Sequence, residues 1–296
     1  MAAEARHRRV AWARMDPIEH HPRDLDALER AYALLESPSV VAKLTNIVGK
    51  PLESTLDKLP QGASRRIHAA VRGALATSVR VALSSLRDDP KASASTRSHT
   101  WLSAASGAAG GFFGFAGLLV ELPVTTTIMM RSIADIARSE GFSPQDPTVA
   151  QDCVAVFALG GPSRDDDASE TGYYAARSML QEVLKQTATQ LTRNAAVRAG
   201  QQGAAGASAG KAGAWLAKLI ETVASRFGVV VTHKLAAQLM PVIGAASGAA
   251  VNALFIQHYQ DMARGHFIIR RLEDAYGSEA VHAAYSGLSR RLKAPA

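Results

Sequence analysis

Two long uncharged stretches punctuated by glycine, residues 100–120 and 235–257, most constrain how this chain can fold. Each has the roughly 20 residues needed to cross the hydrocarbon core of a bilayer, although small residues outnumber Leu and Ile in both. On a helix, glycines four residues apart leave bare backbone on one face, where another helix can approach closely. The stretches are therefore expected to be tightly packed helices, either in a protein core or against a membrane. The pairs with this spacing are Gly107 and Gly111, Gly110 and Gly114, and Gly244 and Gly248.

The rest of the sequence predicts an all-α chain. Short β-branched runs such as 229–232 lack the period-two alternation of a strand and lie inside longer helical patterns. We expect a compact multi-helix bundle with the two Gly/Ala-rich helices at its centre. A charged N-terminal arm, 1–22, precedes a single helical domain, 23–296, and the Gly/Ala/Gln-rich segment 199–213 is the predicted linker within it.

Proline and glycine predict several helix ends. Pro123 is expected to end the first glycine-rich helix and begin the next one, which Gly141 then stops. Asp146 and Pro147 predict another helix start, with proline in the first turn. Gly277 is expected to end the last long helix, ahead of a short terminal helix over 278–293.

Composition and charge favour a cytoplasmic protein, either soluble or peripheral on the inner face of the cytoplasmic membrane. The single cysteine, Cys153, excludes an intrachain disulfide and any multi-cysteine metal site. The N-terminus lacks the apolar segment of a secretory signal. The net charge is +7. Residues 61–100 contain seven Lys and Arg residues, and the only acidic residues among them are Asp88 and Asp89. Such a stretch suits an anionic lipid surface or a solvated helix face, and no nucleic-acid motif accompanies it.

The strongest candidate for chemistry is a polar stripe around Glu121 and Asp135. Helical spacing places Glu121, Thr125, Ser132 and Asp135 on one face, with Arg131 at its edge. However, 14 residues separate the two carboxylates by about 21 Å on a straight helix, so one metal ion cannot bridge them. At a helix junction before Pro123, Glu121 is expected to cap the new N-terminus, with ion or ligand contact as the alternative.

Other chemical signatures are weak. The histidines form no metal-binding pair, the glycine-rich stretch lacks a phosphate-loop ending, and Cys153 lies in an apolar context typical of a small core residue. No cofactor and no metal is therefore predicted. Asn252, among Ala and Val, is expected to hydrogen-bond to a neighbouring helix.

Two segments together resemble the bacterial EcsC protein family. The first runs from Gly110 through Glu121-Leu-Pro123 to the Arg131-Ser-Ile-Ala134 pattern, and the second is the Pro-x-x-Gly-Ala-x-x-Gly-x-x-x-Asn block ending at Asn252. Glu121 stands where many members carry Asp, which keeps the carboxylate. The similarity extends over roughly 25–290. The family is named for its genetic association with an ABC exporter operon, so the resemblance implies a role beside a transporter.

Three functional classes stay open from the sequence. The leading one is a non-enzymatic accessory factor at a membrane surface, with an anionic membrane or a transporter or envelope protein as partner and no nucleic acid. The second is a metal-assisted hydrolase that uses Glu121 and Asp135 separately, with Asp152, His233 or His258. The third is an apolar-ligand or lipid-binding bundle. Whether any reaction is catalysed and which oligomer forms are left open.

The glycine-rich helices carry one further expectation. Residues 104–120 and 241–257 are expected to pack against each other or on shared neighbours in a protein core. The glycines expected to face other helices are Gly110, Gly114, Gly117, Gly244 and Gly248.

Overall fold

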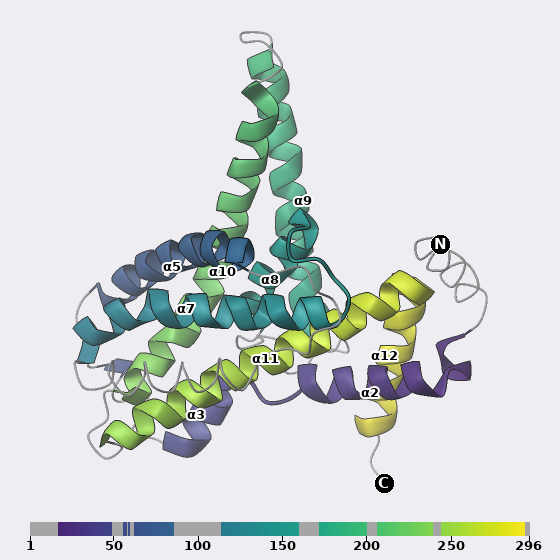
Figure 1. Cartoon of the computed structure of the whole chain (residues 1–296), viewed down its shortest axis with the longest axis horizontal. Helices are drawn as coiled ribbons and strands as arrows, with labels where there is room; N and C mark the ends of the chain where they lie inside the picture. The colour runs from purple at the N-terminus through teal and green to yellow at the C-terminus, as the bar shows by residue number, and fades with distance from the viewer. Residues whose placement is uncertain are drawn as a thin grey trace.

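A computed structural model defines most of the chain as helix (Figure 1). It describes residues 17–48, 56–57, 59, 62–85, 114–159, 172–199, 206–238 and 244–293. Within these residues there are nine α-helices, one short 3₁₀ helix and no strand, which confirms the all-α prediction. The α-helices are α2 (Pro22–Leu35), α3 (Val40–Val48), α5 (Ala63–Ser85), α7 (Gly114–Ser139), α8 (Pro147–Leu159), α9 (Gly172–Ala199), α10 (Gly206–Gln238), α11 (Gly244–Tyr276) and α12 (Ser278–Lys293).

Helix α11 lies at the centre of the body and contacts α2, α7, α8 and α12 (Figure 1). Helix α5 covers α7 and also packs against α10. The buried side chains of these helices form one continuous apolar core. Helices α9 and α10 contact each other and project together from the body as a two-helix hairpin (Figure 1).

Helices α7 and α11 run in the same direction across the body. Three side-chain contacts join them at nearly constant sequence offset: Glu121 with Asn252, Ser132 with Gln260, and Glu140 with Arg271. The polar stripe predicted on 121–135 therefore faces a second helix over much of its length.

Most predicted helix ends are confirmed. Asp146 accepts a hydrogen bond from the backbone N–H of Thr148 at 2.8 Å, which caps α8 where the sequence predicts a start. Gly141 and Gly277 both have positive φ, +92° and +89°. Only glycine adopts that conformation at little cost, so both positions terminate their helices.

The predicted break at Pro123 is wrong, because α7 continues through it from Gly114 to Ser139. Proline removes one backbone donor from a helix, a local cost of about 3 kcal/mol. Burial of this helix offsets that cost, since Leu122, Thr125 and Thr126 on either side of the proline are each at most 2 % exposed. Glu121 therefore lies inside a helix and caps no new N-terminus.

The predicted linker is helical in its second half. Helix α9 ends at Ala199 and α10 begins at Gly206, so 206–213 belongs to a helix. Alanine is the strongest helix former and offsets the glycines interspersed with it.

The two glycine-rich stretches fall largely outside the described residues. Helices α7 and α11 do pack against each other, but Gly110 lies outside the described residues, as do the surroundings of Gly114, Gly117, Gly244 and Gly248. No helix in the described part of the chain has both the length and the hydropathy of a bilayer span.

A glycine on α11 controls its contact with α2. A Cβ added at Gly265 would lie 2.5 Å from Cγ of Leu35, whereas one at Gly287 on α12 meets no atom within 4 Å. We expect Gly265→Ala to lower the free energy of unfolding by about 1–3 kcal/mol through overpacking. Gly287→Ala, the matched control, should raise the free energy of unfolding by about 0.5–1 kcal/mol, because alanine lowers the conformational entropy of the unfolded chain. Urea denaturation of both variants measures the contrast, and equal effects would contradict the close packing.

Candidate functional site

A buried charge junction joins three helices of the body. The Glu121 carboxylate on α7 accepts hydrogen bonds through Oε1 from Lys234 Nζ on α10 at 2.9 Å and from Asn252 Nδ2 on α11 at 2.8 Å. Thr125, one turn along α7, donates to the same oxygen at 3.2 Å. Lys234 is 1 % exposed and Asn252 is fully buried. Side chains more than 100 residues apart therefore converge on a single carboxylate oxygen.

The environment of this junction is strongly desolvating. Burial lowers the pKa of Lys234, and the neighbouring Glu121 carboxylate opposes that shift. The ammonium also lies 5.3 Å from the centre of the Phe255 ring, a favourable cation–π geometry. The second carboxylate oxygen, Oε2, is buried and accepts no hydrogen bond from the residues that the structure describes. Glu121 thus acts as the acceptor that allows a lysine to be buried.

The other predicted polar residues of α7 have different partners. Asp135 accepts a hydrogen bond from Nε of Arg138 at 3.1 Å, within the same helix, and both are buried. Ser132 accepts one from Gln260 of α11 at 2.9 Å. Arg131 is half-buried, and its Nε makes no hydrogen bond in the described structure. The structure therefore does not bring Glu121 and Asp135 together, since both lie on one continuous helix.

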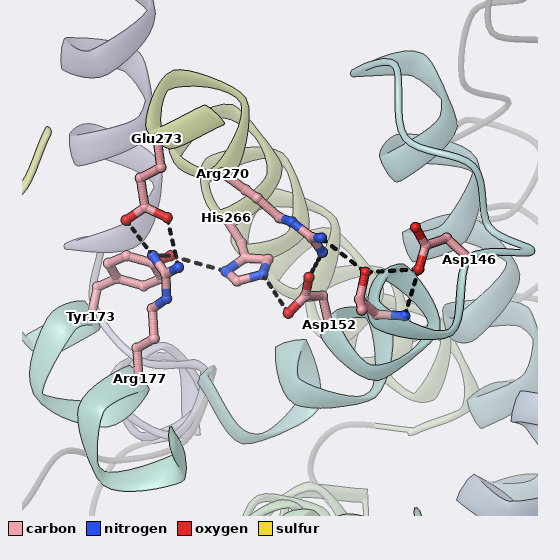
Figure 2. Close-up of polar contacts among 8 residues, drawn as sticks. Asp146, Asp152, Tyr173, Arg177, His266, Arg270 and Glu273 are labelled. Atoms are coloured by element: carbon pink, nitrogen blue, oxygen red, sulfur yellow. Dashed lines mark hydrogen bonds and ion pairs between the residues drawn. The ribbon is translucent and has the colours of Figure 1, made fainter. Parts of the chain in front are cut away.

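A second polar group, the Tyr173 cluster, lies where α8, α9 and α11 meet (Figure 2). The Tyr173 hydroxyl of α9 lies 2.9 Å from Nδ1 of His266 on α11, and Nε2 of that ring lies 3.7 Å from Oδ1 of Asp152 on α8. Because Nε2 faces a carboxylate, the neutral ring carries its proton there, and Nδ1 accepts the Tyr173 hydroxyl hydrogen. Burial, with the Arg177 charge next, lowers the pKa of His266 to about 3.

Charged residues flank the contacts of Tyr173, His266 and Asp152 on both sides. Arg177 on α9 makes a bidentate ion pair with Glu273 on α11, with distances of 2.8 and 2.7 Å. On the other side, Arg270 pairs with Asp152 and also donates to Thr148 Oγ1 at 3.1 Å. Figure 2 shows these contacts running across α11 from α9 to the start of α8.

The N-terminus of α9 is capped from a distant part of the chain. The Glu36 carboxylate accepts hydrogen bonds from the backbone N–H groups of Gly172 at 3.2 Å and Tyr173 at 3.3 Å, and from the Tyr285 hydroxyl at 2.9 Å. A carboxylate here satisfies orphan donors and complements the helix dipole. The body-side end of α9 is thus fixed by α2, α11 and α12.

The charged side chains of these two groups are paired with one another across helices. Glu121 and Lys234 are buried, whereas the ion pairs of the Tyr173 cluster are half-buried. Burial raises the pKa of the Cys153 thiol to about 12, which keeps it protonated and a poor nucleophile. No group of three His, Cys, Asp or Glu side chains able to hold a metal occurs among the described residues.

Sequence reasoning missed the partners of these residues. Lys234 was not singled out, because a helical lysine is usually solvated. Tyr173, Arg177 and Glu273 belong to no motif and meet only in the fold. The hydrogen bond of Asn252 to a neighbouring helix does occur as expected. Asp152 contacts His266 and Arg270 rather than Glu121.

The buried pair can be tested by a double-mutant cycle. Glu121→Leu or Lys234→Met alone leaves one buried charge uncompensated and should lower the free energy of unfolding by about 3–5 kcal/mol. The free energy of unfolding should fall less in the double variant than in either single variant, because neither charge is then buried without its partner. Arg72→Ala, which breaks the exposed pair with Glu221, is the control and should cost less than about 1 kcal/mol. Additive losses in urea denaturation would exclude the coupling.

His266 predicts a loss of stability in mild acid. Its folded pKa, about 3, is below the unfolded value of about 6.5, so below pH 6.5 the unfolded chain binds a proton that the folded one does not. Stability should therefore fall between pH 6.5 and 3, by up to about 1.4 kcal/mol per pH unit. His266→Gln should remove this component, and Tyr173→Phe should retain it. An identical pH slope in wild type and His266→Gln would contradict the assignment.

Comparison with protein families gives a match along most of the chain. The model of the EcsC protein family matches residues 25–272. Comparisons with curated proteins and with solved structures find no match. The matched range includes the Glu121–Lys234 junction and all of the Tyr173 cluster except Glu273, which immediately follows it. The chain therefore belongs to the EcsC protein family.

Proposed function

We propose that the protein is a non-enzymatic accessory factor that works at an anionic membrane surface. The observation that carries this proposal is the segregation of charge along the chain. Residues 61–100 and 183–220 contain twelve of the 33 Lys and Arg residues but two of the 26 Asp and Glu residues. In the remaining chain acidic residues exceed basic ones, 24 to 21. The net positive charge thus resides in two segments.

The first segment approaches the second at the base of the α9–α10 hairpin, where α5 packs on α10. Helix α5 contains four arginines and no acidic residue, and Arg65, Arg66 and Arg72 are exposed. Arg72 pairs with Glu221 of α10 at 3.6 Å, and α5 packs along α10 beside the base of the hairpin (Figure 1). Clustered Lys and Arg contribute about 1 kcal/mol each near an anionic bilayer surface.

The arrangement of the buried carboxylates also supports a non-enzymatic role. Glu121 and Asp135, the residues required by the hydrolase alternative, are paired with Lys234 and Arg138. The resemblance to an exporter-associated family adds a transporter or another envelope protein as the proposed partner at that surface. The proposed location is accordingly the inner face of the cytoplasmic membrane.

Vesicle flotation tests the proposal. The full chain should float with vesicles of phosphatidylglycerol and phosphatidylcholine and stay behind with phosphatidylcholine alone. Raising the salt concentration should release it, because screening shortens the Debye length from about 8 Å at 0.15 M to about 3 Å at 1 M. Absence from both lipid fractions would reject the membrane role. Equal, salt-insensitive binding to both would favour insertion of apolar surface instead.

A further inference from the structure

We propose that the projecting part of the α9–α10 hairpin, residues 183–199 and 206–218, is the element that docks on the anionic phospholipid surface. This inference rests on the proposed membrane function and adds the contact surface and its orientation. Helix α5 is also basic, but it lies outside the proposed contact with the lipid surface.

The hairpin extends well beyond the body. Leu180 is the last side chain of α9 described as buried, and Leu219 is the first on α10. Beyond them α9 continues for 19 residues and α10 for 13, or about 28 and 20 Å at 1.5 Å per residue. Lys185 and Lys218, whose side chains are described, are both exposed. Figure 1 shows the two helices leaving the body together.

Charge along the hairpin is of one sign. Between Glu182 and Glu221 the sequence has no acidic residue and five basic ones, Lys185, Arg193, Arg198, Lys211 and Lys218. Its projecting length exceeds the Debye length of about 8 Å at physiological salt. A flat surface at the far end therefore experiences the hairpin charge while the acidic excess of the remaining chain is screened.

The residue types favour a lipid surface over nucleic acid. No aromatic residue occurs from 183 to 214, whereas proteins that bind single strands stack bases on aromatic rings. Ala, Gly, Thr and Gln dominate this segment instead. Long Lys and Arg stems can lie along apolar surface while their charged ends contact headgroup phosphates. Trp215, the first aromatic, is partly buried against the core.

Both helices of the hairpin are fixed to the body, and this sets the direction in which the hairpin projects. Arg177 and Glu273 hold α9 to α11, and Lys234 and Glu121 hold α10 to α7. Arg72 contacts Glu221, 15 residues into α10, so it lies about 22 Å along that helix from its start. A flat surface touching the projecting end is thus more than two Debye lengths from α5.

Two charge-matched triple variants test the inference. Arg193→Gln/Arg198→Gln/Lys211→Gln removes three of the five positive charges of the hairpin, and Arg65→Gln/Arg66→Gln/Arg72→Gln removes three of the four on α5. Each removes three positive charges from the full chain. Vesicle titration with phosphatidylglycerol and phosphatidylcholine at physiological salt should show about 100-fold weaker binding for the hairpin variant. The α5 variant should bind less than about 3-fold more weakly, because its charges are screened.

The outcomes separate this inference from the proposed function. If wild type binds and the hairpin variant binds equally well, the inference is overturned and the membrane role stands. Equal losses in both variants would show that only net charge matters, which also overturns it. If wild type does not bind the vesicles, both this inference and the proposed function are rejected. Tighter binding of the full chain to polyglutamate or RNA than to the vesicles also rejects both.

A measurement on wild type covers the case in which the hairpin variant does not fold. Amide hydrogen exchange with and without vesicles should show added protection in 183–199 and 206–218 and none in 63–85. Protection confined to 63–85 would place the contact on α5 and overturn the inference.

Discussion

The buried Lys234–Glu121 pair is the constraint on which the arrangement of the central helices depends. Apolar contacts are non-directional, so they would tolerate small shifts of α7, α10 and α11. An ammonium 1 % exposed has no such tolerance. Displacing one helix by a turn, about 5.4 Å, would leave a buried charge without its partner. Asn252 extends the same requirement to α11. We therefore expect the junction to specify register more than it adds stability.

That register determines where the hairpin points. Helix α10 is continuous from Gly206 to Gln238, so the end held by Lys234 and the projecting end belong to one helix. Helix α9 is fixed independently, through the Glu36 cap at its N-terminus and the Arg177–Glu273 pair five residues along. Two helices fixed separately and packed on each other resist bending better than either alone. The buried clusters therefore connect the core to the function proposed for a distant surface.

The sequence predicts structure well where the cause is local. Gly277 ends α11 because its own backbone adopts positive φ, and Asp146 caps α8 through the next turn. It fails at Pro123, where the local preference is overridden by burial of the surrounding helix. It also fails for the candidate site: Glu121 was identified, but Lys234 lies 113 residues away and Tyr173 is 93 residues from His266. No periodicity within one helix encodes such partners.

Net charge alone is a poor guide to what this chain attracts. A net charge of +7 spread evenly over a body of this size would produce a weak field, because salt screens it within a Debye length. Placing part of the basic excess on a projecting hairpin separates it from the acidic groups of the body by more than the screening length. The acidic excess elsewhere then has little effect on an approaching anionic surface. Geometry, more than composition, therefore makes a membrane-facing role physically reasonable for a chain whose buried charged groups are largely committed to holding helices in place.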